Sequence, residues 1–432
     1  FGRFRSILAG GQGTIMHLGI GPIVTGSIVL QLLGGADLLG LDTQNNPRDQ
    51  VLYQGLQKLL VLIMCVLTGL PMVFAGNFLP ADPAIASSLG IGTGMLSWVI
   101  FAQVFMGGVL ILFMDEVISK WGVGSGVGLF IIAGVSQRLI GGLISVPDLL
   151  PGNTLGIIPT YIQMALGDIP ATMDTILFGF NNAQGNTTGI VAILTTILIF
   201  VIVVYAESVR VEIPLSHARV KGARGRFPVK LIYASVLPMI LVRALQQNIQ
   251  FLGQILNSQT GLPSWLGQYP TGSSQPISGL FYYMNPVQAP QDWMFFVYTQ
   301  TQEPWQVILR LAVDLTFMVV GGAIFAIFWV ETTDMGPEAT AQQIQNSGMQ
   351  IPGFRQNPGV LEKVLERYIP QVTVIGGALV GLLAVGANMM GTIGGVSGTG
   401  LLLTVSITYK LYEEIAEEQL MEMHPMMRQM FG

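Results

Sequence analysis

The side chains that could act as nucleophiles, general bases or metal ligands are few in this sequence of 432 residues. Three histidines, His17, His217 and His424, lie far apart along the chain, and the single cysteine, Cys65, lies within an apolar stretch. This spacing matches no Cys/His metal site, and one cysteine forms no disulfide within the chain. The Gly-x-x-x-x-Gly-Lys-Ser/Thr motif of a nucleotide-binding loop is also absent from the sequence. We therefore predict no catalytic residues, no metal and no cofactor, and we do not expect an enzyme.

The composition indicates that most of the chain lies in a lipid bilayer. Hydrophobic residues make up 51% of the chain and the mean hydropathy is +0.60. Charged residues make up only 10%, against about 25% in soluble domains. Nine apolar runs with few charges are candidate membrane helices: Gly19 to Leu33, Leu59 to Phe78, Met95 to Met114, Gly126 to Val146, Gly189 to Tyr205, Leu231 to Leu256, Val307 to Val330, Ile369 to Met390 and Leu401 to Tyr412. The sequence thus predicts an all-α polytopic membrane protein in one domain, residues 1–432.

The basic residues predict which loops face the cytoplasm, because loops that stay inside carry most of the Lys and Arg. One alternate set of loops, with the carboxyl-terminal tail at 411–432, holds 14 of the 19 Lys and Arg residues. The opposite loops, at about 80–90, 147–186 and 257–304, contain no Lys or Arg. The nine segments therefore begin outside and end inside the plasma membrane, and the carboxyl terminus is cytoplasmic. Because the chain begins at Phe1 rather than Met, we expect further sequence upstream, including another helix.

The first apolar segment is too short and too interrupted for an ordinary membrane helix. A helix needs about 20 apolar residues to cross the hydrocarbon core, whereas Leu18 to Leu33 is shorter and opens with Gly-x-Gly-Pro. Irregular backbone at membrane depth is tolerated only where protein buries it or where it lines a water-filled cavity. This segment therefore predicts a pore.

Three arginines lie inside or near the ends of the predicted helices, where a charge is costly. Arg310 is followed by Asp314, so we expect this pair, four residues apart, to neutralise itself within one helix. Arg138 and Arg243 lie late in their segments, and we expect their side chains to extend outward to the membrane surface.

The first long inside loop, residues 206–230, combines an alternating pattern with a basic cluster. Apolar and polar residues alternate from Val209 to Leu215 and predict a short strand, followed by a basic tip from Arg219 to Arg226. Cations on such a projecting hairpin suit an anionic partner such as ribosomal RNA. The positive-inside rule alone would also place them here, and the sequence leaves both interpretations open.

The second long inside loop, residues 331–367, carries Arg355 near its tip. With 37 residues it is too long to be a simple connection. We therefore expect it to have a function of its own on the cytoplasmic side.

Several long blocks of the sequence together resemble the SecY family of protein-conducting channels. They are HLGIGPIVTGSIVLQLL (17–33), LFMDEVISKWGVGSGVGLFIIAGVSQ (112–137), VVYAESVRVEIPLSHARVKG (203–222), IFWVETT (327–333) and GTGLLLTVSITYKLYEE (398–414). The resemblance spans nearly the whole chain and is closer to the archaeal and eukaryotic versions than to the bacterial one. This sequence contains no counterpart of the family's first transmembrane helix and amphipathic amino terminus. Residues 1–17 would then form the plug segment, and the nine helices would be the second to the tenth.

The resemblance implies ten helices in two halves of inverted topology that form an hourglass with an aliphatic ring at its waist. By position, the ring residues would be Ile20, Val24, Val127, Ile131, Ile240 and Leu403. It also implies a lateral gate between the second and third helices on one side and the seventh and eighth on the other. The polar residues at this gate would be Thr25, Asn248 and Thr68, the last at a position where relatives can carry a carboxylate.

The resemblance further implies the partners. The cytoplasmic loops would contact the ribosome or a cytosolic motor through Arg219, Lys221, Arg224, Arg226 and Arg355. Two small membrane subunits, SecE-like (gamma) and SecG-like or beta, would clamp the channel. Substrates would arrive through the signal recognition particle receptor pathway as nascent polypeptides, and apolar segments would leave into the lipid bilayer.

The function that these features favour is the central pore-forming subunit of a protein translocase. The alternative is a secondary transporter or ion channel with inverted repeats, which should carry buried carboxylates or charged rings for its ion. Apart from Arg310 and Asp314, the sequence shows no convincing set of this kind. An intramembrane hydrolase would need Ser, Asp or His residues on facing helices, and the histidines are not so placed.

Overall fold

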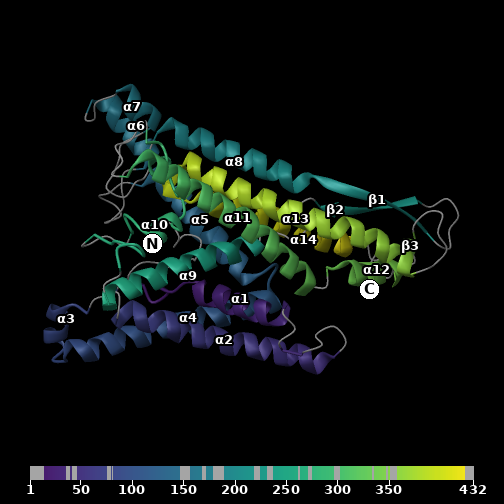
Figure 1. The fold of residues 1–432 in the computed structure, drawn as a ribbon, viewed down its shortest axis with the longest axis horizontal. Coiled ribbons are helices and arrows are strands. Elements are labelled where there is room, and N and C mark those ends of the chain that lie inside the picture. The colour runs from purple at the N-terminus through teal and green to yellow at the C-terminus, as the bar shows by residue number, and fades with distance from the viewer. Residues whose placement is uncertain are drawn as a thin grey trace.

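Long helices that run side by side dominate the structure, a computed structural model (Figure 1). It describes residues 14–35, 39–40, 46–74, 79, 81–145, 156–167, 172–178, 189–217, 224–230, 237–260, 263–270, 275–295, 302–332, 335–346, 349–350 and 358–423. The predicted plug segment is therefore described only from Thr14 onward, and residues 1–13 lie outside the described part.

The described part of each of the nine predicted apolar segments coincides with a helix; residues 75–78, 146 and 231–236 of three segments lie outside the described part. The nine are α1 (Gly21–Gly35), α2 (Pro47–Phe74), α4 (Thr93–Trp121), α5 (Gly126–Ile144), α8 (Ile190–Ser208), α9 (Leu237–Thr260), α11 (Pro304–Thr332), α13 (Pro358–Met390) and α14 (Gly398–Met423). Shorter elements are α3 (Pro83–Ser88), α6 (Ile157–Leu166), α7 (Met173–Phe178), α10 (Leu280–Tyr283), α12 (Pro337–Asn346) and the 3₁₀ turns η2 (Pro290–Asp292) and η3 (Ile393–Gly395). The prediction of a helical membrane bundle is confirmed.

Several helices extend beyond their apolar runs. α2 begins at Pro47 rather than Leu59, α13 begins at Pro358 rather than Ile369, and α14 continues to Met423 rather than ending at Tyr412. Hydropathy marks only the part of a helix that lies in lipid, whereas backbone hydrogen bonding continues into the polar turns beyond it. The tail predicted from 411 is therefore helical as far as Met423.

Six of the described helices are long and apolar enough to cross a membrane unaided: α2, α4, α5, α8, α11 and α13. The other three predicted segments differ for separate reasons. α1 has only 15 residues, α9 carries Arg243 with several glutamines, and α14 ends in a glutamate-rich stretch. These three helices depend on their neighbours for burial.

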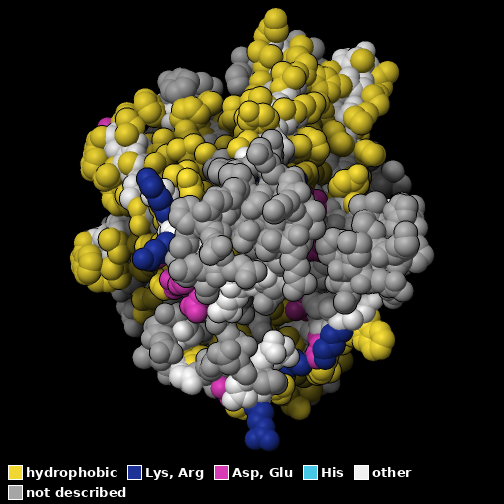
Figure 2. All heavy atoms as spheres, turned by 90° about the vertical axis from the view of Figure 1, so that its right-hand side faces the viewer, with side chains coloured by type: hydrophobic (Ala, Val, Ile, Leu, Met, Phe, Trp, Pro, Cys, Tyr) yellow, Lys and Arg dark blue, Asp and Glu magenta, His cyan; other side chains and the backbone are white. Residues whose placement is uncertain are grey.

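The loops sort to the two ends of the bundle. In Figure 1, β1 (Arg210–His217), β2 (Arg224–Lys230), β3 (Met349–Gln350) and α12 lie at the right-hand end, while α3, α6 and α7 lie at the left-hand end. Figure 2 faces the right-hand end and shows described Lys, Arg, Asp and Glu side chains on it, with hydrophobic side chains gathered toward the upper rim. The two loops that the sequence assigns to the same side of the membrane thus lie at the same end of the molecule.

The first long loop forms the predicted strand and hairpin. β1 pairs antiparallel with β2, from Arg210 opposite Lys230 to Ser216 opposite Arg224. β1 also pairs with β3 of the second long loop, through Ser216 opposite Gln350, so the sheet has the order β2-β1-β3. This small sheet is an addition to the helical fold class, and it joins the two long loops.

Small residues allow the closest helix contacts. A Cβ at Gly377 of α13 would lie 2.6 Å from the carbonyl oxygen of Gly322 on α11, and a Cβ at Gly381 would overlap the carbonyl oxygen of Met318. Backbones approach this closely in membrane bundles only where side chains are missing from the interface. α11 and α13 therefore form a tightly packed pair in the second half of the chain.

Candidate pore and lateral seam

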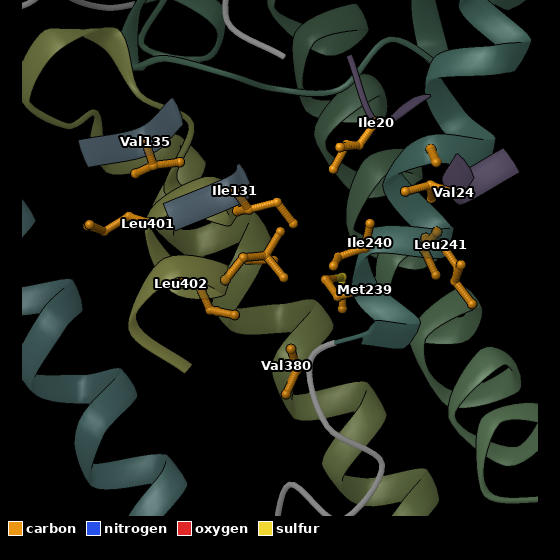
Figure 3. Packing of buried hydrophobic residues seen from close by; sticks show 14 of the residues in the cluster. Ile20, Val24, Ile131, Val135, Met239, Ile240, Leu241, Val380, Leu401 and Leu402 are labelled. Carbon is orange, nitrogen blue, oxygen red and sulfur yellow. The ribbon is translucent and has the colours of Figure 1, made fainter. Parts of the chain in front are cut away.

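The six predicted ring residues lie in one buried hydrophobic cluster. Five of them are at most 4% exposed, and Val127 is half-buried and packs against the cluster. They come from four helices that are distant in sequence, namely α1, α5, α9 and α14, with Ile20 directly before the first turn of α1. Figure 3 shows Ile131 on one side and Ile20 and Ile240 on the other, with their side chains extended toward one another. The structure thus brings together residues that the resemblance had assigned to the ring.

The local sequence of the first segment explains how Ile20 and Val24 reach the cluster. Gly19 adopts a positive φ of 58°, and its amide donates to the carbonyl of Met16 at 3.1 Å, which forms a turn before α1. Pro22 then lies in the first turn of the helix, where its missing N–H costs nothing. The helix therefore begins at the cluster rather than at one end of the bundle.

The turn before α1 packs against α4 at a glycine. A Cβ at Gly107 would overlap the carbonyl oxygen of Ile15, and a Cβ at the adjacent Gly108 would lie 2.8 Å from the Cys65 sulfur. Both glycines are buried. The end of the predicted plug segment that the structure describes is therefore held against α4 by backbone contact.

The cluster also contains residues that sequence reasoning missed. Val135 follows Ile131 by one turn of α5, Met239 and Leu241 flank Ile240, and Val380 comes from α13 (Figure 3). Nothing in the apolar run of a membrane helix separates a residue of this kind from one that faces lipid. Only the i, i+4 spacing from Ile131 to Val135 could have indicated the shared face.

At the predicted lateral gate, two of the three residues are hydrogen-bonded. The Asn248 amide nitrogen on α9 donates to the Thr25 hydroxyl on α1 at 3.3 Å, and the Thr25 hydroxyl donates to the Gly21 carbonyl at 2.9 Å. Thr68 lies half-buried on α2 and takes no part in this hydrogen bond. We call the contact of α1 with α9 through Thr25 and Asn248 the lateral seam.

On its other side, α1 packs closely on α2. The Gln57 amide donates to the Ser27 hydroxyl at 3.2 Å, and a Cβ at Gly26 would lie 3.1 Å from a Val61 methyl group. Ser27 hydrogen-bonds toward α2 and Thr25 toward α9, so the two faces of α1 carry comparable polar contacts.

The expected ion pair between Arg310 and Asp314 is wrong, and so is the expected outward extension of Arg243. Arg243 is 2% exposed and its Nη1 lies 3.2 Å from the Oδ1 of Asp314, which is fully buried. Asp314 therefore pairs across helices, with α9. Arg310 donates instead to the carbonyls of Asn285 at 2.8 Å and Pro286 at 2.9 Å.

The segment from α10 to η2 surrounds these charges. The Arg310 guanidinium lies 5.2 Å from the centre of the Tyr282 ring and 3.9 Å from the Asp292 carboxylate. Burial raises the pKa of the Tyr282 hydroxyl, and the nearby Arg310 charge offsets part of that rise. The amide of Val287 donates to Asp314 Oδ2 at 3.2 Å. Each buried charge among these residues has a partner of opposite charge or an oriented peptide group.

The basic loop residues are described only in part. Arg224 and Arg226 lie on β2, while Arg219, Lys221 and Arg355 lie outside the described residues. At the base of the hairpin, Arg210 pairs with Glu413 of α14 at 3.1 Å. The hairpin is thus joined both to the second loop, through β3, and to the last helix.

Comparison with known proteins agrees with this geometry. The model of the SecY family matches residues 14–412. The chain is 73% identical to the protein translocase subunit SecY of Haloarcula marismortui, over 100% of this chain and 88% of that protein. It is 49% identical to the subunit of the same name from Archaeoglobus fulgidus, over 100% of this chain and 87% of that protein.

Solved structures show the same fold. The structure described as "The structure of a protein conducting channel" superposes with a TM-score of 0.78 at 36% identity, and covers 98% of this chain and 86% of the solved one. "Sec61 in the Canine ribosome-channel complex from the endoplasmic reticulum" superposes with a TM-score of 0.74 at 35% identity, with the same coverage. The family model and the identities across the full chain lead to one conclusion: this chain belongs to the SecY family.

Proposed function

We propose that this chain is the central pore-forming subunit of a protein translocase, which passes unfolded polypeptides across the plasma membrane and releases apolar segments sideways into the lipid. The observation that supports the proposal is that the six ring residues, from four helices distant in sequence (α1 with the residue before it, α5, α9 and α14), belong to or pack against one buried hydrophobic cluster, to which α2, α4, α8, α11 and α13 also contribute. Membership of a family whose relatives are protein translocase subunits supports it.

An aliphatic waist suits a channel for unfolded chains. A translocating polypeptide presents every type of side chain, and a waist with fixed hydrogen-bonding groups would hold some of them and stall. Short aliphatic side chains such as Ile20, Val24 and Ile131 offer no polar partner and exclude water when the channel is empty. The waist would therefore seal the resting membrane against ions and still admit a variable chain.

The lateral seam provides the second exit. Thr25 and Asn248 form one neutral hydrogen bond between α1 and α9, and a contact of this kind contributes little net stability. A segment rich in Leu, Ile and Val gains free energy by moving into lipid, whereas a charged segment loses it. We propose that this seam opens for such segments, with Thr68 on the α2 side.

Exposed aromatic residues support the membrane placement. Trp98 and Trp121 on α4 are 57% and 87% exposed, and their separation of 23 positions corresponds to roughly 34 Å of helix. This length matches a hydrocarbon core of about 30 Å with an aromatic belt at each interface. Tyr205 and Tyr412 are also exposed; Tyr205 lies in the last turn of α8, which leads into β1 at the right-hand side of Figure 1. We propose that this side is cytoplasmic, with the carboxyl terminus on it.

The partners follow from the same placement. We propose that the β1–β2 hairpin, with Arg224 and Arg226, docks the ribosome or a cytosolic motor together with the second loop. One structural neighbour is a channel in a ribosome complex, which supports this role. The exposed apolar face of α8 would pack against small membrane subunits of the SecE-like and SecG-like or beta kinds.

A secondary transporter is less well supported. Such a protein needs a buried charge that is free to bind an ion or a proton. Asp314 accepts hydrogen bonds from Arg243, Gln246 and Val287, so protein donors engage both of its oxygens and the Arg243 charge offsets its own.

Ion conductance tests the proposed pore. Purified complex in planar bilayers should show little resting conductance, and serine at Ile20 and Val24 should raise it, because hydroxyl groups stabilise water at the waist. Unchanged conductance in the double variant would contradict the assignment of the ring.

A further inference from the structure

One buried polar cluster is separate from the six ring residues and from the hydrogen bond of the lateral seam. Asp314 of α11 is fully buried and Arg243 of α9 is 2% exposed. The Oδ1 atom of Asp314 accepts hydrogen bonds from Arg243 at 3.2 Å and from the Gln246 amide at 2.9 Å. Its Oδ2 atom accepts a hydrogen bond from the backbone amide of Val287 at 3.2 Å. One carboxylate therefore joins α9, α11 and the segment that follows α10.

Side chains of α9 and α11 also hydrogen-bond to backbone carbonyls of the segment 281–287. From α9, Gln246 donates to the carbonyl of Met284 at 3.2 Å and Gln250 to that of Phe281 at 3.0 Å. From α11, Arg310 donates to the carbonyls of Asn285 and Pro286. The segment 281–287 thus lies as a bridge between α9 and α11, with charged or amide donors at each end.

The contact of α9 with α1 is of a different kind. Among the described residues, its polar component is the neutral hydrogen bond from Asn248 to Thr25, both half-buried, and it includes aliphatic packing around Ile20 and Val24. A buried ion pair with further hydrogen bonds resists separation far more strongly than one neutral bond, because separation would leave a charge unpaired in a low dielectric. α9 therefore lies between one strong interface and one weak interface.

Arg243 is also close to the ring residue of the same helix. It follows Ile240 by three residues, so the two side chains are neighbours on one face of α9. The ion pair consequently holds Ile240 at a fixed position relative to α11.

From these contacts we infer that Asp314 and Arg243 are positioning residues of the channel: they make α9 and α11 move as one body, so that the channel opens laterally between α1 and α9. This inference rests on the proposed lateral seam. In this role the buried charges hold two helices together and do not bind a transported ion.

Two cysteine pairs test the inference in the reconstituted complex, in a chain whose single cysteine is replaced (Cys65→Ala). The first pair, Thr25→Cys with Asn248→Cys, reports on the seam. The second, Val242→Cys with Gly321→Cys, reports on the α9–α11 interface, where a Cβ at Gly321 would lie 3.8 Å from the Val242 Cβ, a separation typical of disulfides. Cross-linking is started after a secretory polypeptide fused to a tightly folded domain has jammed the channel.

With the charges present, jamming should reduce cross-linking of the seam pair at least fivefold and leave the α9–α11 pair unchanged. Asp314→Asn alone would leave Arg243 as an unpaired buried charge and endanger folding, so the test variant removes both charges (Arg243→Met with Asp314→Leu). In that variant, jamming should reduce cross-linking of the α9–α11 pair at least threefold. Removal of the interhelical pair of α2 and α4 (Lys58→Met with Glu116→Leu) is the matched control and should change neither pair.

Two results would overturn the inference: loss of the α9–α11 cross-link on jamming while the charges are present, or full retention of it in the charge-free variant. The first measurement needs no charge variant to fold. Failure of the proposed seam has a separate signature, namely a Thr25 and Asn248 pair that cross-links equally in resting and jammed channels.

Discussion

The amide nitrogen of Asn248 on α9 lies 3.3 Å from the hydroxyl oxygen of Thr25 on α1. Because the Thr25 hydroxyl donates its proton to the Gly21 carbonyl, its oxygen is free to accept from Asn248, and the direction of the bond is fixed. Val24 of the same helix, and Ile20 directly before it, belong to the hydrophobic cluster. One short helix therefore carries both the waist of the proposed pore and one half of the proposed seam.

Removal of this hydrogen bond should favour the open channel. The variant Thr25→Val keeps the side-chain shape and abolishes the acceptor. The loss of a neutral hydrogen bond of about 1 kcal/mol should raise the open fraction roughly fivefold, measured as open time in single-channel recordings. The matched control is Ser27→Ala, which breaks the bond from Gln57 on the opposite face of α1 and should leave the open fraction unchanged. Equal effects of the two variants would show that the α1–α9 contact has no special role.

The glycine at position 107 should be essential for seating the turn before α1. In an exposed helix, Gly→Ala stabilises by up to about 1 kcal/mol, but a Cβ at Gly107 would overlap the carbonyl of Ile15. Gly107→Ala should therefore destabilise the complex by about 1 to 3 kcal/mol in thermal unfolding. Gly141→Ala on α5, where a Cβ meets nothing within 4 Å, should be neutral or stabilising. If both alanine variants behave alike, the turn does not pack on α4.

Charge reversal on β2 should weaken binding of ribosomes. Arg224→Glu with Arg226→Glu changes the hairpin charge by four, and the loss of affinity should be greater at low salt because surface charges are screened at high salt. The measurement is co-sedimentation of the reconstituted complex with ribosomes at two salt concentrations. The control, Arg48→Glu with Lys410→Glu, makes the same change of charge at exposed residues of α2 and α14, outside both long loops, and should weaken binding less. If the β2 variant binds ribosomes as tightly as the unmodified complex, these cations only determine membrane orientation.

The Arg210 to Glu413 pair should contribute little to stability. Both side chains are partly exposed, 41% and 25%, and exposed ion pairs contribute about 0 to 1 kcal/mol. Arg210→Gln should therefore lower the unfolding temperature by no more than a few degrees. A much larger loss would show that the pair organises the hairpin base and α14 cooperatively.

Hydropathy predicted the helices well and their ends poorly. An apolar run shows which residues lie in lipid, so all nine segments appear as helices, but the polar first turns of α2 and α13 give no such signal. β1 could be predicted from the alternation around Ile213, whereas β3 has two residues and no pattern long enough to detect. Its pairing with β1 depends on contacts between distant parts of the chain.

The buried charges show a more general limit. Asp314 and Arg310 are four residues apart, and within an isolated helix that spacing favours a pair. In the folded chain, Arg243 and the peptide groups of 285–287 satisfy them instead, because tertiary partners in a low dielectric outweigh a local contact. The ring residues were identified through resemblance, since an aliphatic residue such as Val380 gives no sequence signal of where it faces.

The most direct test of the account is the resting ion conductance of the reconstituted complex when the proposed waist is made polar. Ile20→Ser with Val24→Ser should raise conductance severalfold, because water can then occupy the waist. Leu361→Ser with Leu365→Ser makes the same chemical change at two buried residues of a separate cluster and should leave conductance at the level of the unmodified channel. If the first variant conducts no more than the second, the cluster of Ile20 and Val24 is not the seal of a channel.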